Sequence, residues 1–213
     1  MPLTLRAATP ADKPGITEAH HTAFAGGVIS ERVFPPSAES AQNWDRDLDS
    51  YFTDPAIHAL VVEDDSTTPP TIIAFAKWTS PRAAGTPAPP PRTEEQVMGR
   101  PWPEAADLGL ARAFLWGMER KRREIMGEGR FWFLHILAVR PADQRRGAGG
   151  MLVRWGVERA DAEGLPCYVD STPVAVPVYE RHGFRVVDRL VIEGADHGGE
   201  DLVETMMVRD ARK

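Results

Sequence analysis

Apolar and polar residues follow one another along this chain in patterns that predict a mixed α/β domain. Short runs rich in Val, Ile, Leu and Phe indicate strands, whereas apolar residues spaced three or four positions apart indicate helices. The predicted strands are 3–8, 57–63, 71–79, 131–139, 165–170, 184–192 and 202–209. The predicted helices are 10–25, 40–52, 104–126, 147–163 and 174–182. We therefore expect one sheet covered by helices, with a strand order that the pattern alone leaves open.

The segment between Pro81 and Pro103 interrupts this order, because it holds 7 of the 19 prolines in the chain. Proline has a fixed φ angle and no N–H group, so we expect a loop here and neither regular helix nor central strand. Loops of this length are usually functional or disordered, so the segment either lines the substrate site or is a tolerated insertion. The helix after it carries the charged run 119–124, which we expect to face solvent.

The run 131–139 is almost wholly apolar, which is typical of a central strand buried on both faces. His135 is its one ionisable residue, two positions before Leu137, so a regular strand points both side chains to the same face. Histidine has an ordinary pKa near ~6.5 and is suited to act as a general base. A hydrogen-bonded core histidine is the alternative interpretation.

The composition limits which classes of protein are possible. A chain of 213 residues, 42% hydrophobic and 26% charged, fits a single domain spanning 1–213. The net charge of −6 argues against a nucleic-acid partner. Cys167 is the only cysteine, which excludes a disulfide framework, and its apolar context places it in the core. No HExxH motif occurs, so we expect no metal.

The N-terminal residues lack the basic and apolar regions of a signal peptide. No apolar run approaches the roughly 20 residues that span a bilayer. These features predict no membrane partner and a cytoplasmic location, with an additional nuclear location as the alternative.

A glycine-rich segment opens the helix that follows the run 131–139. It reads Gln144-Arg145-Arg146-Gly147-Ala148-Gly149-Gly150. Glycines at such a junction let the backbone approach a ligand, and the unpaired N–H groups of the first helical turn favour a phosphate. Arg145 and Arg146 add positive charge. The spacing fits neither a Walker A loop nor a Rossmann fingerprint. An ordinary helix start is the alternative to a phosphate site.

The pattern Gln144-x-x-Gly147-x-Gly149 resembles the Q/R-x-x-G-x-G/A signature of the GCN5-related N-acetyltransferase (GNAT) superfamily. This resemblance implies that residues 144–150, including Ala148 and Gly150, cradle the pyrophosphate of acetyl-coenzyme A. It also implies that the main chain of three residues holds the pantetheine arm. These are Leu137, Ala138 and Val139.

The resemblance further implies a single GNAT-like domain with a mainly antiparallel mixed sheet, splayed at its centre and covered by helices on both faces. It covers 131–184, the expected acetyl-coenzyme A-binding core. The segment 81–129 is then an inserted Pro-rich loop and helix, where the identity of the substrate is encoded.

A second match lies about 30 residues later. The run Val178-Tyr179-Glu180-Arg181-His182-Gly183-Phe184 resembles the Leu-Tyr-Glu-Lys-x-Gly-Phe element of the same superfamily. The resemblance implies that the Tyr179 hydroxyl protonates the departing thiolate, and a positioned acid suits that step. A core tyrosine is the alternative. Seven residues earlier the superfamily often has an asparagine that contacts pantetheine. Here this position is Thr172, as in members of fungal type, which weakens the contact expected there.

The group that accepts the proton of the amine is left open by the sequence. The run around His135 resembles the same strand in arylalkylamine N-acetyltransferases, where histidines help remove this proton, and Val176-Pro177-Val178-Tyr179 is similar to that subfamily's Val-Pro-Phe-Tyr. The subfamily's other histidine position is Phe133 here. Asp170 is the alternative base or amine anchor, and it is otherwise a cap or turn residue. Water is the third possibility.

We expect direct transfer of the acetyl group of acetyl-coenzyme A to a primary amine of a small molecule, without a metal. Five aromatic residues are candidates for an apolar acceptor pocket: Phe24, Phe34, Trp78, Trp102 and Trp116. A peptide N-terminus or a lysine side chain is the alternative acceptor, and a non-catalytic acyl-coenzyme A-binding module is the alternative class. The sequence leaves a monomer and a homodimer equally open.

Overall fold

The computed structural model describes residues 2–196 and 199–212. Its centre is a seven-stranded sheet with the order β1-β2-β3-β4-β5-β7-β6. The strands are β1 (Leu3–Ala7), β2 (Ile57–Asp64), β3 (Thr71–Thr79), β4 (Trp132–Val139), β5 (Cys167–Ser171), β6 (Arg185–Ile192) and β7 (Leu202–Arg209). Neighbouring strands are antiparallel except for β4 and β5, which are parallel. The expected mixed, mainly antiparallel sheet is confirmed.

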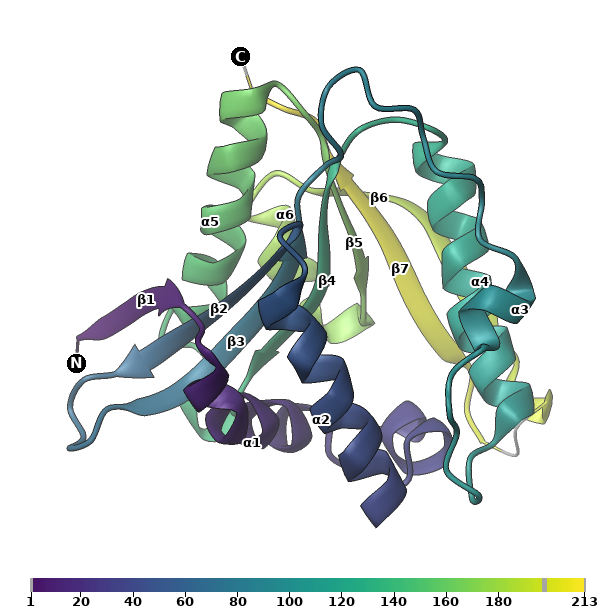
Figure 1. Cartoon of the computed structure of the whole chain (residues 1–213), viewed down its shortest axis with the longest axis horizontal. Coiled ribbons are helices and arrows are strands. Elements are labelled where there is room, and N and C mark those ends of the chain that lie inside the picture. The colour runs from purple at the N-terminus through teal and green to yellow at the C-terminus, as the bar shows by residue number, and fades with distance from the viewer. Residues whose placement is uncertain (1, 197–198, 213) are drawn as a thin grey trace.

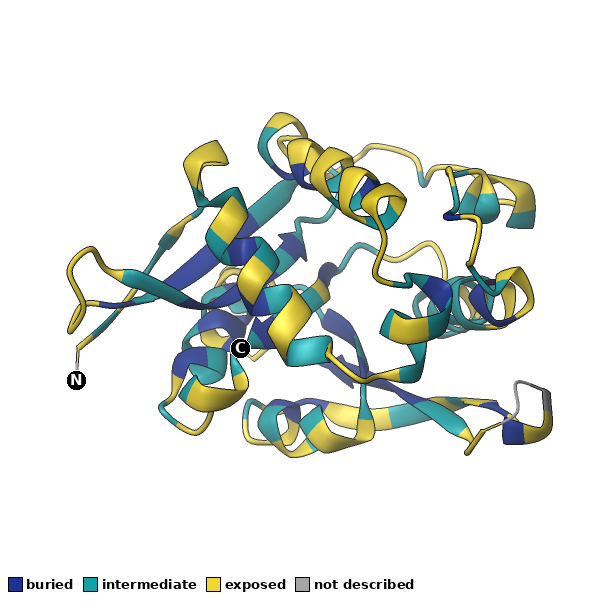
Figure 2. Cartoon of the chain, turned by 90° about the horizontal axis from the view of Figure 1, so that it is seen from below, coloured by how far each residue is buried: buried dark blue, intermediate teal, exposed yellow. Residues whose placement is uncertain are grey.

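The α-helices cover both faces of this sheet (Figure 1). They are α1 (Lys13–Phe24), α2 (Ala38–Thr53), α3 (Glu94–Met98), α4 (Leu108–Met126), α5 (Ala148–Glu163) and α6 (Val176–Glu180). Buried side chains of α5 and α6 pack on one face of the sheet, which we call the α5 face. Side chains of α1, α2 and α4 pack on the other, which we call the α4 face. Figure 2 shows the buried strands between helices whose outer surfaces are exposed.

The sheet opens between β4 and β5. These strands pair only through Trp132–Cys167, Phe133–Tyr168 and Leu134–Val169. Beyond Leu134, β4 continues to Val139 without β5 as a neighbour, and the two strands diverge (Figure 1). The expected splay is therefore present, and it begins at the level of His135.

A β-bulge in β4 changes the direction of the residues that follow it. Leu134 lies opposite Trp78 and Ile136 opposite Lys77, so His135 has no partner in β3. The extra residue reverses the alternation of side chains. His135 therefore stacks on Phe133, on the α4 face, whereas Leu137 packs on the α5 face. The expectation that His135 and Leu137 share a face is wrong for this reason.

The Pro-rich segment contains one short helix that composition did not predict. Thr93 caps α3: its hydroxyl accepts a hydrogen bond from the N–H of Gln96, whose side chain accepts one from the N–H of Thr93. The expectation of no helix between Pro81 and Pro103 was wrong because 92–100 is free of proline. The next helix begins at Leu108 and not at 104, since Asp107 is its N-cap. A π-helical turn, Ile29–Val33, was also not predicted.

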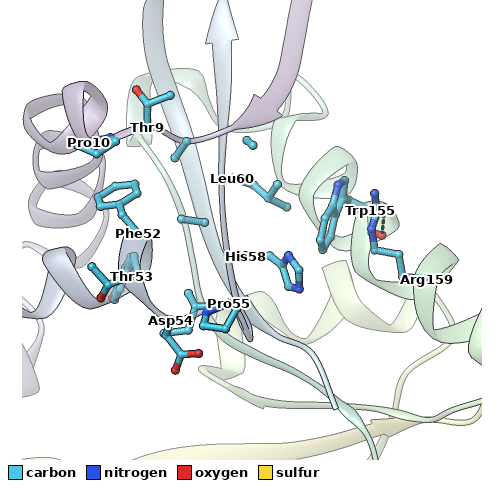
Figure 3. Close-up of a pocket in the computed structure, with 15 residues that line it drawn as sticks. Thr9, Pro10, Phe52, Thr53, Asp54, Pro55, His58, Leu60, Trp155 and Arg159 are labelled. Atoms are coloured by element: carbon cyan, nitrogen blue, oxygen red, sulfur yellow. Dashed lines mark hydrogen bonds between the residues drawn. The ribbon is translucent and has the colours of Figure 1, made fainter. Parts of the chain in front are cut away.

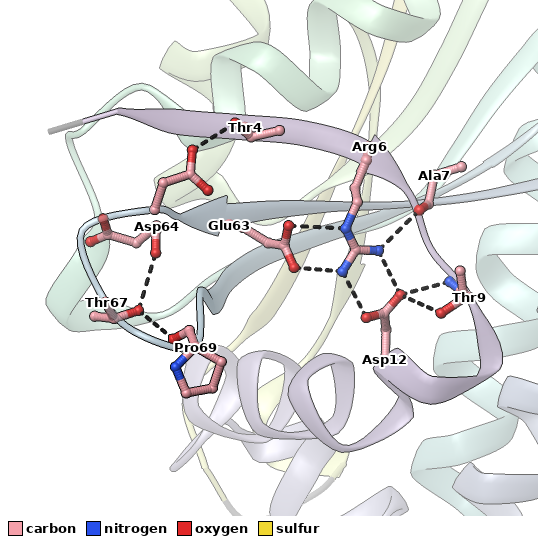
Figure 4. A network of polar contacts seen from close by, with 10 residues as sticks. Thr4, Arg6, Ala7, Thr9, Asp12, Glu63, Asp64, Thr67 and Pro69 are labelled. Carbon is pink, nitrogen blue, oxygen red and sulfur yellow. Dashed lines mark hydrogen bonds and ion pairs between the residues drawn. The ribbon is translucent and has the colours of Figure 1, made fainter.

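An ion network fixes the N-terminal strand to the sheet (Figure 4). The Arg6 guanidinium on β1 contacts both carboxylate oxygens of Glu63 on β2, at 2.9 and 2.5 Å, and both of Asp12, at 2.7 and 2.8 Å. The hydrogen bonds from Arg6 lower the pKa of Asp12 to about 2. Asp12 in turn accepts hydrogen bonds from the N–H and hydroxyl of Thr9. The predicted helix start at Thr9-Pro10 is thus present, as a 3-10 turn that leads into α1.

Candidate active site

The glycine-rich segment forms the turn between β4 and α5. Gly147 has a φ of 97° and Arg145 a φ of 64°, both left-handed, and the position where a Cβ of Gly147 would stand is open space. The first hydrogen bond of α5 runs from the N–H of Met151 to the carbonyl of Gly147. The N–H groups of Ala148, Gly149 and Gly150 therefore have no acceptor within the helix. An open turn with free N–H groups at a helix start suits a phosphate.

The two arginines of this turn are not equivalent. Arg146 donates to Asp64 on β2 at 2.6 Å and to Asp143 at 2.5 Å, so its charge is already compensated. Asp64 is buried, and hydrogen bonds from Ser66 and Arg146 lower its pKa to about 2. Arg145 has no ion pair within the described residues. Arg146 thus anchors the turn to β2, and a phosphate contact by Arg145 stays a prediction.

The main chain of β4 faces the opening of the sheet on one side. Leu137, Ala138 and Val139 are paired with β3 but have no strand neighbour toward β5. Their free backbone groups suit a partner that binds as an added strand. The Gln144 side-chain amide donates to the Val139 carbonyl at 3.5 Å. The pantetheine-holding edge predicted from the sequence is therefore available.

Tyr179 on α6 is 4% exposed, and its ring packs edge-on against Phe184 at 5.7 Å between centroids. Its hydroxyl has no hydrogen-bond partner within the described residues. Burial, with a smaller contribution from the charge of Glu204, raises the pKa of Tyr179. The phenol is therefore protonated near neutral pH, as an acid must be before it acts.

His135 is exposed to solvent at the level where the sheet opens. Its ring lies against that of Phe133, with 3.7 Å between centroids and a tilt of 36°, and its Nε2 lies 2.8 Å from the Thr79 hydroxyl. Desolvation, with the positive charges of Lys77 and Arg122, lowers the pKa of His135 well below its ordinary value. The imidazole is neutral near pH 7, but its surroundings disfavour the imidazolium that a base would become.

Asp170 is the residue of β5 that follows the last pair with β4. Its Oδ1 accepts a hydrogen bond of 2.6 Å from the Tyr168 hydroxyl. Burial raises the pKa of Asp170 to about 6, against the opposing effects of Tyr168 and Arg122. A carboxylate with a pKa near the operating pH is a suitable proton acceptor. The structure thus places Asp170 at the opening, beside β4, and its side chain is not a helix cap.

Four charged residues that the sequence did not single out belong to the same region. They are Glu204, Arg122, Glu119 and Lys77. Glu204 on β7 is buried, and burial followed by the charge of Asp170 raises its pKa to about 7. The Arg122 guanidinium lies 4.7 Å from the centre of the Phe133 ring and pairs with Glu119. The Lys77 ammonium lies 4.5 Å above the ring of Tyr51 on α2, and burial lowers its pKa.

The charged run 119–124 therefore has two faces. Glu119 and Arg122 have side chains only 14% and 21% exposed and turn toward the sheet, whereas Arg120 and Glu124 are exposed. The expectation of a solvated run was wrong for the first two. The signal for Glu204 was a single acidic residue inside an otherwise apolar strand pattern.

The structure also shows where Cys167, Thr172 and Trp78 lie relative to the predictions from the sequence. Cys167 is fully buried in the core, as expected. Thr172 precedes a 3-10 turn, and its carbonyl accepts from the Ala175 N–H. Trp78 packs on the α5 face, where a Cβ at Gly156 would come within 2.3 Å of its ring. Trp78 therefore does not line an acceptor pocket on the α4 face.

The other aromatic candidates are dispersed. Phe34 and Trp102 stack on each other beside Arg100, Phe24 packs with α1 and α2, and Trp116 lies in a shallow hollow next to Leu190. A larger hollow at the edge of β2 is lined by Phe52 and Pro10 on one side and by His58 and Trp155 on the other (Figure 3). It contains none of the predicted site residues.

The described residues, 2–196 and 199–212, lack two features. Within them, no group of three or more His, Cys, Asp or Glu side chains is arranged to hold a metal ion. No helix among them is long and apolar enough to cross a bilayer.

The site thus consists of the turn at Gly147, the open edge of β4 and the buried Tyr179. Comparison with known proteins shows to which family the chain belongs. The model of the acetyltransferase (GNAT) family matches residues 28–184. The chain belongs to this family. This GNAT protein is accordingly an acetyl-coenzyme A-dependent N-acetyltransferase, and acetyl-coenzyme A is its cosubstrate.

Solved structures share its fold at low sequence identity. A mosquito arylalkylamine N-acetyltransferase like 5b superposes with a TM-score of 0.70 at 19% identity, over 98% of this chain and 100% of that one. A Corynebacterium glutamicum protein described as histone acetyltransferase HPA2 and related acetyltransferase gives 0.62 at 19%, over 100% and 98%. A phosphinothricin acetyltransferase from Sinorhizobium meliloti, solved with acetyl-coenzyme A, gives 0.60 at 19%, over 99% and 89%. These neighbours have small-molecule and protein acceptors in their names.

Proposed function

We propose that this GNAT enzyme transfers the acetyl group directly to a primary amine of a small molecule, which enters the opening of the sheet from the α4 face. The observation that carries this proposal is that His135 and Asp170 follow the last β4–β5 pair at the same level of the sheet. Tyr179 has an unpartnered hydroxyl and is electrostatically coupled to the same region through Glu204.

The inserted segment supports a small acceptor. Arg100 donates to Asp47 on α2 at 2.8 Å, and the side-chain amide of Asn43 donates to the Pro101 carbonyl at 3.0 Å. The N–H of Glu104 donates to Glu39 at 2.9 Å. The segment that leads into α4 is thus tied to α2 on the acceptor side of the sheet. We infer that this connection restricts the approach of a long peptide more than that of a small amine.

Aromatic and charged groups on the α4 face suit an amine with an apolar body. Phe133 offers a ring beside His135, and Tyr51 offers another under Lys77. The structural likeness to a protein named as an arylalkylamine N-acetyltransferase and the run 176–179 are consistent with this class. We therefore favour an arylalkylamine-type acceptor.

The chemistry assigns a role to each predicted residue. The turn 144–150 holds the pyrophosphate, and the open edge of β4 at Leu137–Val139 holds the pantetheine arm. A backbone N–H near Val139 polarises the thioester carbonyl. Tyr179 protonates the sulfur. We assign the amine proton to Asp170 in preference to His135, because Lys77 and Arg122 disfavour a second positive charge on the imidazole.

The test is release of free coenzyme A thiol from acetyl-coenzyme A, measured across arylalkylamines, polyamines, amino sugars and peptides. We expect turnover with arylalkylamines and at least tenfold lower kcat/KM with peptides. A higher kcat/KM with peptides than with arylalkylamines would indicate a protein acetyltransferase instead. Acetyl-coenzyme A binding without turnover for any amine would favour a binding module.

A further inference from the structure

Asp170 and Glu204 bring two carboxyl groups to the same side of neighbouring strands. In the β5–β7 register Asp170 lies opposite Met206, and Glu204 stands two residues before Met206. Side chains two positions apart on a strand share a face, so both carboxyls lie on the α4 face. Diagonal neighbours of this kind are roughly 7–8 Å apart, with their Cβ atoms somewhat closer. This spacing leaves room for one small cation between the two carboxyls.

Packing does not explain Glu204. The residue is 7% exposed, and its carboxylate has neither a hydrogen bond nor an ion pair within the described part of the chain, although its oxygens are not fully enclosed. A buried charge without a partner is costly, so such groups are normally paired or hydrogen-bonded. Asp170 accepts a single hydrogen bond, from Tyr168, which leaves the rest of its carboxylate free. The two carboxylates therefore have oxygen atoms that accept no hydrogen bond, at a site that is largely shielded from solvent.

A third side chain without a hydrogen-bond partner lies on the other face of the sheet. Tyr179 belongs to a different element and is more than nine-tenths buried, and its hydroxyl has no partner among residues 2–196 and 199–212. Its ring packs on the α5 face, whereas the two carboxyls lie on the α4 face. A substrate that passes through the opening of the sheet can therefore meet the two acceptors on one face and the Tyr179 donor on the other.

We propose that Asp170 and Glu204 form one carboxyl pair that receives the acceptor as its ammonium ion and takes up the proton that the amine loses. This inference rests on the proposed function and adds Glu204 to its site. It narrows the substrate class to amines that are cationic in solution. Sulfur or oxygen acceptors, which bring no cation, are not expected.

The proton balance of the reaction is closed by this pair. One proton passes from the ammonium to a carboxylate of the pair, which leaves a lone pair on nitrogen. As the C–N bond forms and the C–S bond breaks, Tyr179 gives its proton to sulfur. The second proton lost by nitrogen restores the Tyr179 phenol. The carboxyl then releases the first proton to water, so that one proton is produced per amide formed.

The charged groups around the pair favour a shared proton. The charges of Arg122 and Glu119 on α4 and the hydrogen bond from Tyr168 on β5 act on the pKa of Asp170, and the charge of Asp170 raises the pKa of Glu204. On the far side, Lys121 of α4 pairs with Asp188 of β6 at 2.7 Å. Two like charges in a desolvated site do not ionise independently. Removal of the Asp170 charge is therefore expected to make Glu204 more acidic.

The pair is tested first without acetyl-coenzyme A. In protein labelled with ¹³C-glutamate, the Glu204 side-chain signal is the one that disappears in Glu204→Gln. We expect it to titrate near pH 7 and to titrate at least one pH unit lower in Asp170→Asn. Glu124→Gln, an exposed position on α4, is the control and leaves the signal unchanged. Titration of Glu204 near ~4.3, its ordinary pKa, or an unchanged value in Asp170→Asn, overturns the pair.

Ammonium capture is tested with methylammonium chloride at pH 8, against sodium chloride at the same ionic strength. We expect methylammonium alone to shift the Glu204 signal saturably in the wild type and not in Asp170→Asn. Equal responses to both salts overturn the inference.

The kinetic test uses 2-phenylethylamine as the acceptor substrate. We expect Glu204→Gln to lower kcat/KM at least tenfold while acetyl-coenzyme A affinity is unchanged, and Asp170→Asn to move the acid limb of the pH profile to lower pH. Wild-type turnover with unchanged kinetics in Glu204→Gln overturns the inference alone. If no amine is turned over but Glu204 titrates as expected, the proposed function is overturned and the carboxyl pair is retained.

Discussion

Leu134 and Val169 form the last backbone pair between β4 and β5, and the next residue of each strand is a predicted site residue. His135 follows Leu134 as the bulge of β4, and Asp170 follows Val169 on β5. One interruption of strand pairing therefore opens the sheet and brings these two side chains to the opening. The predictions below depend on this geometry.

Gly147 and Gly164 provide a matched pair of variants at the two ends of α5. Both have left-handed backbones, with φ of 97° and 66°, and a Cβ at either position meets nothing within 4 Å. Alanine is strained at both, by about 1 kcal/mol. We expect Gly147→Ala to weaken acetyl-coenzyme A binding at least tenfold in calorimetric titration, because it changes the phosphate turn. Gly164→Ala should have a similar cost in stability and unchanged affinity. Equal affinities in both variants would contradict the assignment of the turn.

Arg145 and Arg146 should separate affinity from stability. Arg145→Gln removes a charge without an ion pair, so we expect weaker acetyl-coenzyme A binding, a smaller dependence on salt and an unchanged melting temperature. Arg146→Gln leaves the buried Asp64 without its cation, so we expect a loss of about 1–3 kcal/mol in the free energy of unfolding. Denaturant titration and calorimetry on both variants measure the two effects. A reversed pattern would mean that Arg146 is the phosphate ligand.

Glu204 should make stability depend on pH. Burial and the charge of Asp170 raise its folded pKa to about 7, against about 4.3 in an unfolded chain. The folded protein thus holds this proton to higher pH, and the stability linked to it is full below pH 4 and is lost as the pH rises through 7. We expect Glu204→Gln to match the wild type near pH 4 and to be more stable at pH 8.5 by on the order of 2 kcal/mol. Urea titrations at the two pH values measure the difference, and a variant less stable at pH 8.5 would refute it.

His135→Asn tests whether the imidazole is the base. Desolvation and nearby positive charges lower the pKa of His135 well below its ordinary value, which favours the neutral ring near neutral pH. We expect the variant to lower kcat/KM through lost contacts with Thr79 and Phe133, while the midpoint of the acid limb stays in place. A midpoint that moves or disappears in this variant would identify His135 as the proton acceptor.

The sequence predicted most of the strands and the phosphate turn, because these depend on local signals. The apolar runs locate all seven strands to within about two residues, and the glycines at 147, 149 and 150 mark the turn. It failed where packing or register decides. The bulge at His135 has no local signature, and it reversed the expected direction of Leu137. Thr93 caps a helix inside the segment whose prolines indicated a loop, and Asp107 caps α4, which begins at Leu108 and not at the predicted 104.

The missed site residues share a physical reason. Glu119 and Arg122 belong to a charged run that looks solvated, and only the packing of α4 on β4 turns two of its members inward. Glu204 and Asp170 are 34 positions apart in the sequence. They meet because β7 inserts between β5 and β6, an order that periodicity does not contain. Sequence pattern located the cofactor side of the site well and the acceptor side poorly.

The most direct test of the account compares the wild type with Tyr179→Phe, since the hydroxyl has no partner in the described chain and its loss leaves the packed ring intact. The measurement is acetyl-coenzyme A affinity and thiol release with 2-phenylethylamine on the same preparations. The account predicts equal affinity and a fall in kcat of about 10²-fold or more, because the leaving thiolate has lost its acid. Equal kcat in the two proteins would contradict the placement of the reaction at the opening beside Tyr179.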